Sequence, residues 1–197
     1  MQKGTTTAFL DTKPHYELLD GLRGVAALMV IWYHIFEGFA TSPMDQRFNH
    51  GYLAVDFFFI LSGFVIGYAY DDRWKTMKTK DFFKRRLIRL HPMVVLGAVL
   101  GSITFCIQGC EKWDGSQVSI SMVMLAMLMG IFLIPVAPGA GPEVRGNGEM
   151  YPLNGPSWSL FFEYIGNILY ALFIRKLSTK ALTVLVVLAG RSEEHTS

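Results

Sequence analysis

Three ionisable residues share one stripe of an otherwise apolar stretch near the amino terminus. In LDGLRGVAALMVIWYHIFEGF, His34 lies eleven residues after Arg23, and Glu37 lies three residues after His34. These spacings are close to whole turns of an α-helix, so the three side chains are expected on one face. Histidine is the most common general base in proteins, and a neighbouring carboxylate can orient its ring. The pattern predicts a catalytic site at His34 with Arg23 and Glu37. The alternative is a hydrogen-bonded histidine that packs between helices.

Two further acidic residues lie inside later apolar stretches. Glu163 is the only charged residue of PLNGPSWSLFFEYIGNILYALF. A charge inside a membrane is costly, so we expect a basic partner for this carboxylate, such as Arg23, Arg86 or His34. An ion pair that only fixes the register of two helices is the alternative. Asp56, near one end of YLAVDFFFILSGFVIGYAY, could be solvated, could be a helix-terminal acid, or could be the partner of a buried base.

A pair of arginines precedes the third apolar stretch. Arg86 and Arg89 in DFFKRRLIRLHP lie three residues apart, on one helical face, immediately before Pro92 and the third apolar stretch. The forked guanidinium group suits bidentate contacts, so both arginines are predicted to bind phosphate. On charge alone the alternative is favoured, in which the basic cluster sets membrane topology and binds anionic lipid headgroups.

Composition excludes several classes of protein. The chain has 197 residues, of which 51% are hydrophobic and only 17% are charged, with a net charge of +2. It lacks the excess of basic residues that neutralises nucleic-acid phosphates, so no nucleic-acid partner is expected. Cys106 and Cys110 have no nearby histidine or further cysteine, so no metal site is expected either.

Long uncharged stretches predict an all-α, polytopic transmembrane helix bundle in a lipid bilayer. No charge occurs at residues 93–110 or 115–142, and a spanning helix needs about 20 mainly apolar residues. We expect five spans and a shorter sixth apolar stretch, at residues 24–40, 52–70, 93–108, 118–137 and 156–174, followed by 181–190.

The basic residues set the expected orientation. The predicted loop 71–91 carries eight Lys or Arg residues against three Asp, which favours the cytoplasm and places the amino terminus there too. Simple alternation would put the basic residues at 175–180 outside, against the same tendency. We therefore expect that one intervening segment does not cross fully. Residues 118–137, which contain Pro135, are the candidate for a re-entrant element.

The predicted organisation is a cytoplasmic segment at 1–17, a membrane domain at 18–190 and a tail at 191–197. The tail, RSEEHTS, interrupts an apolar run and resembles a translated sequencing adapter. We therefore expect the natural sequence to stop near Gly190 and residues 191–197 to be a non-native tail. The sequence would then be a truncated gene model. A short polar terminus is the alternative.

Five features in this order resemble the acyltransferase-3 family of integral-membrane acyltransferases. They are LDGLRGVAALMV, the spacing from Arg23 to His34, VDFFFILSGF, the Arg86–Arg89 pair before a proline, and PLNGPSWSLFFE. The resemblance covers residues 18–177. It implies an all-helical bundle of about ten spans, of which this chain would hold the first five or six. It also implies transfer of an acyl group, not an aminoacyl group, from acyl-CoA (acetyl-CoA is expected) to a hydroxyl of a cell-surface or secreted carbohydrate at the bacterial inner membrane.

The same resemblance assigns roles to single residues. Arg86 and Arg89 match a double-arginine motif associated with acyl-CoA. Glu163 matches the acidic position after Trp-Ser-Leu, and Asp56 matches the acid before the aromatic run.

A mechanism follows as a hypothesis. The CoA head would dock at the double-arginine motif and its pantetheine arm would run along the stripe from Arg23 to His34. His34 would then act as a base towards the acceptor hydroxyl or would carry the acyl group itself. Glu37, Asp56 or Glu163 could orient the imidazole or neutralise an arginine. Two alternatives remain: a transporter or exporter that uses the same buried charges without bond chemistry, and an inactive fragment.

Overall fold

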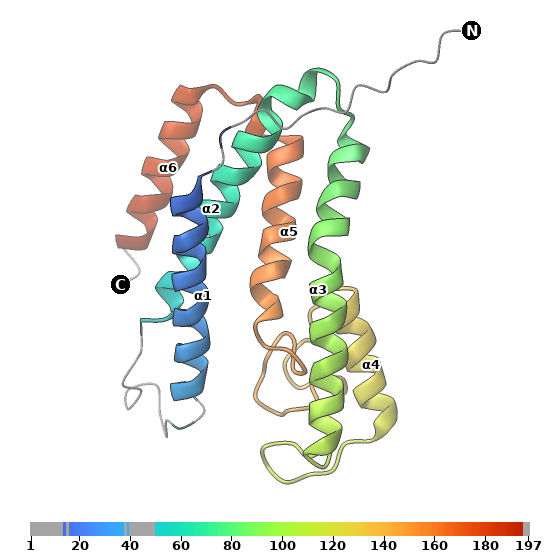
Figure 1. Ribbon diagram of the computed structural model, residues 1–197. Helices are drawn as coiled ribbons and strands as arrows, with labels where there is room; N and C mark the ends of the chain where they lie inside the picture. The colour runs from blue at the N-terminus through green and yellow to red at the C-terminus, as the bar shows by residue number, and fades with distance from the viewer. Residues whose placement is uncertain (1–13, 15, 38, 40–49, 195–197) are drawn as a thin grey trace, which may run out of the picture. The chain divides into compact units, whose positions relative to one another are not determined.

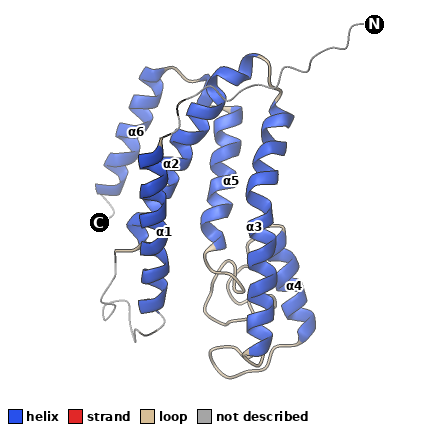
Figure 2. Ribbon diagram, in the orientation of Figure 1, coloured by secondary structure: helices blue, strands red, loops and turns tan. Residues whose placement is uncertain are grey.

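The computed structural model of the chain describes residues 14, 16–37, 39 and 50–194 (Figure 1). Within these residues the regular structure is helical, and the only strand-like pairing is an isolated antiparallel bridge between Glu111 and Gln117 (Figure 2). The prediction of an all-α fold is therefore confirmed. Most of the predicted segment 1–17, and residues 195–197 of the predicted tail, lie outside the described residues.

Four helical segments are long and apolar enough to cross a membrane. They are residues 17–37, 52–75, 79–107 and 157–176. The helices are α1 (Glu17–Glu37), α2 (Tyr52–Tyr70), α3 (Thr79–Ile107), α4 (Ile120–Ile131), α5 (Ser157–Leu172) and α6 (Thr179–Glu194), with short 3-10 turns η1 (Asp71–Lys75) and η2 (Ile174–Lys176) after α2 and α5.

Residues 118–137 form no helix of spanning length, which agrees with the expectation that this stretch does not cross fully. Helix α4 covers only twelve residues of this stretch, which corresponds to about 18 Å against a hydrocarbon layer of about 30 Å. The backbone leaves the helical conformation at Leu133, which has a φ of 51°, and Pro135 lacks the N–H that a continuing helix would need. An apolar composition thus continues past the point where the helix stops.

The predicted loop 71–91 is also corrected, because α3 begins at Thr79 and runs for 29 residues. Phe82 and Arg86, four residues apart, are buried on one face of this helix, while Lys84, Arg85 and Arg89 are exposed. Five of the eight basic residues of this range therefore belong to the first turns of a span, and Arg73, Lys75 and Lys78 precede it. Pro92 lies inside the helix, where it removes one backbone hydrogen bond.

The chain divides into two compact units, residues 1–61 and 62–197, with the boundary inside α2. In the first unit, α1 buries Ala26 and leaves most of its apolar side chains exposed, as expected for a helix whose surroundings are lipid or further helices. Gly51 lies against Tyr33, where a Cβ would overlap the tyrosine side chain.

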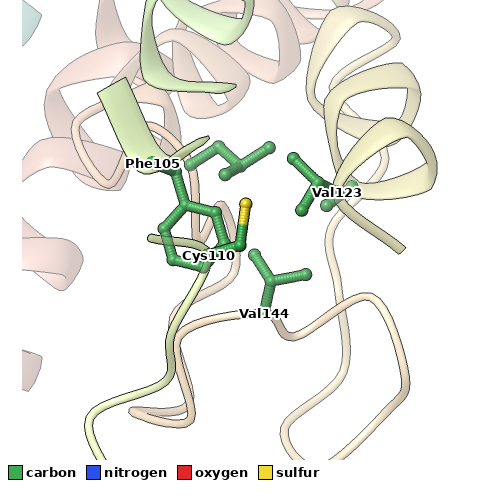
Figure 3. Close-up of a cluster of buried hydrophobic side chains, with 6 residues drawn as sticks. Phe105, Cys110, Val123 and Val144 are labelled. Atoms are coloured by element: carbon green, nitrogen blue, oxygen red, sulfur yellow. The ribbon is translucent and has the colours of Figure 1, made fainter. Parts of the chain in front are cut away.

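The second unit is organised around α3. Helices α4 and α5 lie beside it (Figure 1), and α4 runs antiparallel to it because Val123 packs near Phe105 and Gly130 lies beside Ala98. Figure 3 shows the cluster at the carboxyl end of α3, where Cys110 packs with Phe105, Val123 and Val144. The two cysteines are free; Cys110 is buried, and this burial raises the pKa of its thiol.

Two glycines of α3 let an irregular segment approach it closely. A Cβ on Gly101 would overlap the carbonyl oxygen of Leu153, and a Cβ on Gly97 would overlap the amide nitrogen of Asn154. Small residues therefore serve the docking of the motif PLNGPSW in the second unit.

An aromatic cluster joins the end of α5 to the start of α3. The hydroxyl of Tyr170 donates to Oδ1 of Asp71 at 2.5 Å and accepts a hydrogen bond from Nε1 of Trp74 at 3.1 Å. The Arg175 guanidinium lies over the Trp74 ring, 4.0 Å from its centre, and Phe82 packs in the same cluster. Arg175 therefore lies at the same end of the unit as the basic turns of α3. The conflict between alternation and charge disappears, because α4 is too short to cross and α5 returns to the end where α3 began.

Candidate active site

A buried ion pair links α3 and α5. Arg86, only 3% exposed, donates from Nη2 to Oε1 of Glu163 at 2.6 Å. The hydroxyl of Ser62 on α2 donates to the same carboxylate oxygen at 2.9 Å. Of the three partners that the sequence left open for Glu163, the structure brings Arg86 to it. Sequence reasoning missed Ser62, because a neutral residue in a run of small and apolar side chains gives no charge signal.

Unpaired polar atoms surround this ion pair. The side-chain amide of Asn167 donates to the backbone oxygen of Glu163 at 2.7 Å, one turn along α5. Among the described residues, the buried side-chain atoms with no partner are Nε of Arg86, the hydroxyl of Tyr164 and Oδ1 of Asn167. Buried polar atoms are normally hydrogen-bonded, so these three atoms between α3 and α5 could bond a further polar group.

Arg86 and Arg89 share α3 but differ in surroundings. Three residues turn a helix by about 300°, so the two side chains diverge by about 60°. Arg86 is directed into the packing with α5, whereas Arg89 is exposed. Of the two arginines, Arg89 is open to a large anionic ligand, and the exposed Arg85 lies one turn before it.

The predicted residues of α1 form two short-range pairs. Nδ1 of His34 lies 2.8 Å from Oε2 of Glu37, with side chains 46% and 53% exposed. Nη1 of Arg23 lies 3.6 Å from Oδ1 of Asp20. The structure therefore brings His34 and Glu37 together as the spacing suggested. Asp56 is exposed on α2.

These groups can support acyl transfer but do not form a metal centre. A histidine held by a carboxylate is the usual arrangement of a general base or of an activated nucleophile. In the described ranges, no group of three or more His, Cys, Asp or Glu side chains is arranged to hold a metal ion.

The fold and site define a multi-span helical membrane protein with charged groups inside its bundle, and comparison with known proteins assigns its family. The family profile described as "Acyltransferase domain" matches residues 16–191. The chain is 35% identical over 181 residues to "Protein 2 in picA locus" of Rhizobium radiobacter, covering 86% of this chain and 87% of that protein. It is 30% identical over 169 residues to Acyltransferase MdmB of Streptomyces mycarofaciens, covering 80% of this chain and 38% of that protein.

A protein of Staphylococcus aureus (strain COL) named as an O-acetyltransferase is 39% identical over 95 residues, which are 46% of this chain and 14% of that protein. The chain therefore spans less than half the length of this relative and of MdmB. No solved structure matches the chain significantly. The chain belongs to the acyltransferase-3 family and is an integral membrane protein.

Proposed function

We propose that this protein transfers an acyl group, expected to be acetyl, from acyl-CoA to a hydroxyl of a cell-surface or secreted carbohydrate at the bacterial inner membrane. Family membership and the relatives named as an acyltransferase and an O-acetyltransferase support the reaction type. The basic start of α3 supports a cytoplasmic position for that end and for the amino terminus, because lysine and arginine are enriched on the cytoplasmic side.

The observation that carries the proposal is the hydrogen bond between His34 and Glu37. The carboxylate holds the ring by one nitrogen and leaves the other nitrogen available. Because both side chains are about half exposed in their unit, the imidazole is accessible to a reacting group. Arg23 lies eleven residues before His34, about 16 Å away along α1, and is proposed to contact the acyl donor where it enters this helix face.

The chemistry can follow one of two routes. As a base, His34 takes the proton from the acceptor hydroxyl while its oxygen attacks the thioester carbonyl, the C–S bond breaks, and the CoA thiolate takes up the proton. As a carrier, the ring nitrogen attacks the thioester, CoA leaves, and the acceptor oxygen then attacks the acyl-imidazole. Both routes give one ester and one CoA thiol.

Burial divides the roles of the two arginines of α3. Arg89, exposed beside Arg85, is proposed to contact the phosphates of CoA, since arginine forks suit phosphate. Arg86 is already paired with Glu163 and is proposed to hold α3 and α5 in register, so that the phosphate site is correctly placed. Asp56 is proposed as a further acid near the reacting groups.

The test uses the purified chain in detergent or vesicles with labelled acetyl-CoA and a glycan acceptor. We expect acceptor-dependent release of free CoA from the wild type, and at least a hundredfold loss in His34→Ala, since general acid–base catalysis contributes about 10²–10⁴ in rate. Arg23→Ala is also expected to lower product formation, because a contact with the acyl donor is lost. Undiminished product from either variant would remove that residue from the mechanism. A transporter that uses the same charges would bind its solute and release no CoA.

A further inference from the structure

A shallow groove runs along one face of α3. It has a volume of about 610 Å³ and is lined by residues within the range 87–99, which are apolar except for His91. Ile88 lines the groove and is 65% exposed, whereas Arg86 is buried in its ion pair with Glu163 of α5. Two residues turn a helix by about 200°, so the groove lies on the side of α3 that points away from α5.

Side chains on this face change from basic to apolar along the helix. The residues that share the face follow one another at spacings of four, four, three, four and four: Lys80, Lys84, Ile88, His91, Val95 and Val99. Both lysines are exposed. Residues 78–91 carry six Lys or Arg against one Asp, while residues 93–107 are uncharged. The boundary between lipid headgroups and hydrocarbon is therefore expected within the groove.

The length of this face matches one lipid molecule. Lys84 and Val99 are fifteen residues apart, which is about 22 Å along the helix. A bilayer with its headgroup regions is about 40–45 Å thick, so one leaflet is about 20–22 Å thick. Lysine side chains can extend towards the membrane surface and reach a phosphate there. A basic end and an apolar groove one leaflet long are complementary in charge and polarity to an anionic phospholipid.

A backbone acceptor lies in the middle of the groove. Pro92 has no N–H, so the carbonyl oxygen of Ile88 lacks the donor that a continuous helix would give it. Both residues line the groove, together with His91. A hydrocarbon chain cannot donate to this oxygen, whereas a headgroup hydroxyl can. The polar groups of the groove therefore favour a headgroup that carries hydroxyls.

We propose that this face of α3 binds an anionic phospholipid with a hydroxylated headgroup, with its phosphate at Lys80 and Lys84 and an acyl chain in the groove. The site differs from the one proposed for CoA, because Arg85 and Arg89 point about 100° and 140° away from Lys84 around the helix. The bound lipid would hold the basic end of α3 at the membrane surface. This inference does not depend on the proposed function.

The experiment measures lipid binding to the purified full chain in detergent by native mass spectrometry. The probes are dioleoyl phosphatidylglycerol, which is anionic and hydroxylated, and dioleoyl phosphatidylcholine, which has no net charge. The variant is Lys80→Gln with Lys84→Gln. Its matched control is Lys176→Gln with Lys180→Gln, which removes the same charge from two exposed positions outside α3.

We expect the wild type to bind phosphatidylglycerol about tenfold or more tightly than phosphatidylcholine. The α3 variant is expected to lose about tenfold or more of this affinity, since each basic residue near an anionic surface contributes about fivefold, and the control less than about threefold. Equal affinity of the wild type for the two lipids would overturn the proposal. Equal losses in the variant and its control would do the same, because they would indicate a diffuse attraction of charge.

The groove has a separate test. Val95→Trp fills it and is expected to weaken phosphatidylglycerol binding about fivefold or more, whereas Leu100→Trp, at a 50% exposed position that does not line the groove, is expected to leave binding unchanged. Unchanged binding in Val95→Trp would show that no chain lies there. Displacement of the lipid by excess CoA or by inorganic phosphate would also overturn the proposal, because the basic end would then bind the acyl donor or a free anion.

Discussion

The charged residues of α1 and those between α3 and α5 are of the same kinds but are held in opposite ways. On α1, Arg23 and His34 each pair with a carboxylate three residues away on the same helix, and the side chains are about half exposed. Between α3 and α5, Arg86 pairs with Glu163 across 77 residues of sequence, and the arginine is almost fully buried.

We propose that this difference separates residues that take part in the reaction from residues that hold helices together. An exposed pair on one helix contributes about 0–1 kcal/mol to stability, so the side chains of α1 are available for a reaction. A buried pair between helices holds two desolvated charges, and the loss of one partner leaves the other uncompensated. Residues that look alike in the sequence thus differ in burial according to which helix supplies the partner.

The largest expected effect comes from removing one half of the buried pair. Glu163→Leu leaves Arg86 buried without a counter-ion, and we expect the free energy of unfolding to fall by about 3–5 kcal/mol. Thermal unfolding of the purified protein in detergent, followed by circular dichroism, measures the loss. The double variant Arg86→Leu with Glu163→Leu is expected to recover most of it. A single variant as stable as the wild type would contradict the assigned role.

A second test concerns the docking of the irregular segment on α3. Gly101→Ala puts a methyl group into the carbonyl oxygen of Leu153, which is backbone and cannot turn aside. We expect a loss of about 1–3 kcal/mol, as for overpacking of a core. Gly166→Ala on α5 is the matched control, because no described atom lies within 4 Å of its Cβ position. Equal stability of the two variants would show that the segment does not dock tightly.

A smaller effect is expected at the aromatic cluster. Tyr170→Phe removes the hydroxyl that bonds Asp71 and Trp74, and we expect a loss of about 1–2 kcal/mol because one partner is charged. A double-mutant cycle with Asp71→Ala isolates the bond, and a coupling above about 0.5 kcal/mol is expected. Additive losses would mean that the two ends are joined by packing alone.

Much of the fold could be predicted from the sequence, since uncharged stretches and their lengths indicate the spans. Helix boundaries were not predicted correctly where charge or the length of an apolar stretch was the only guide. The charge of residues 71–91 predicts a loop, whereas Phe82 and Arg86 recur at a helical interval on a buried face and the helix continues through Pro92. The stretch at 118–137 has the length of a span, but the chain leaves the helix before Pro135.

The candidate site could be predicted only in part. The sequence required a basic partner for Glu163 and gave three choices, because the choice depends on which helices are neighbours. Pairing within α1 was predictable, since His34 and Glu37 are neighbours on any helix. Ser62 was not, because a hydroxyl that contacts a charge 101 residues away leaves no local pattern. The roles assigned to Arg23, His34, Asp56 and Arg89 remain predictions.

The smallest effect on stability is expected at the pair on α1. Glu37→Gln keeps the size of the side chain and removes the charge beside His34, and we expect the free energy of unfolding to change by less than about 1 kcal/mol. CoA release with acetyl-CoA and acceptor is expected to fall at least tenfold, because the ring loses its orienting carboxylate. Thermal unfolding and turnover are measured on the same preparation. If instead this variant loses as much stability as Glu163→Leu, the α1 pair is structural too, and the proposed division between residues that react and residues that hold helices together is wrong.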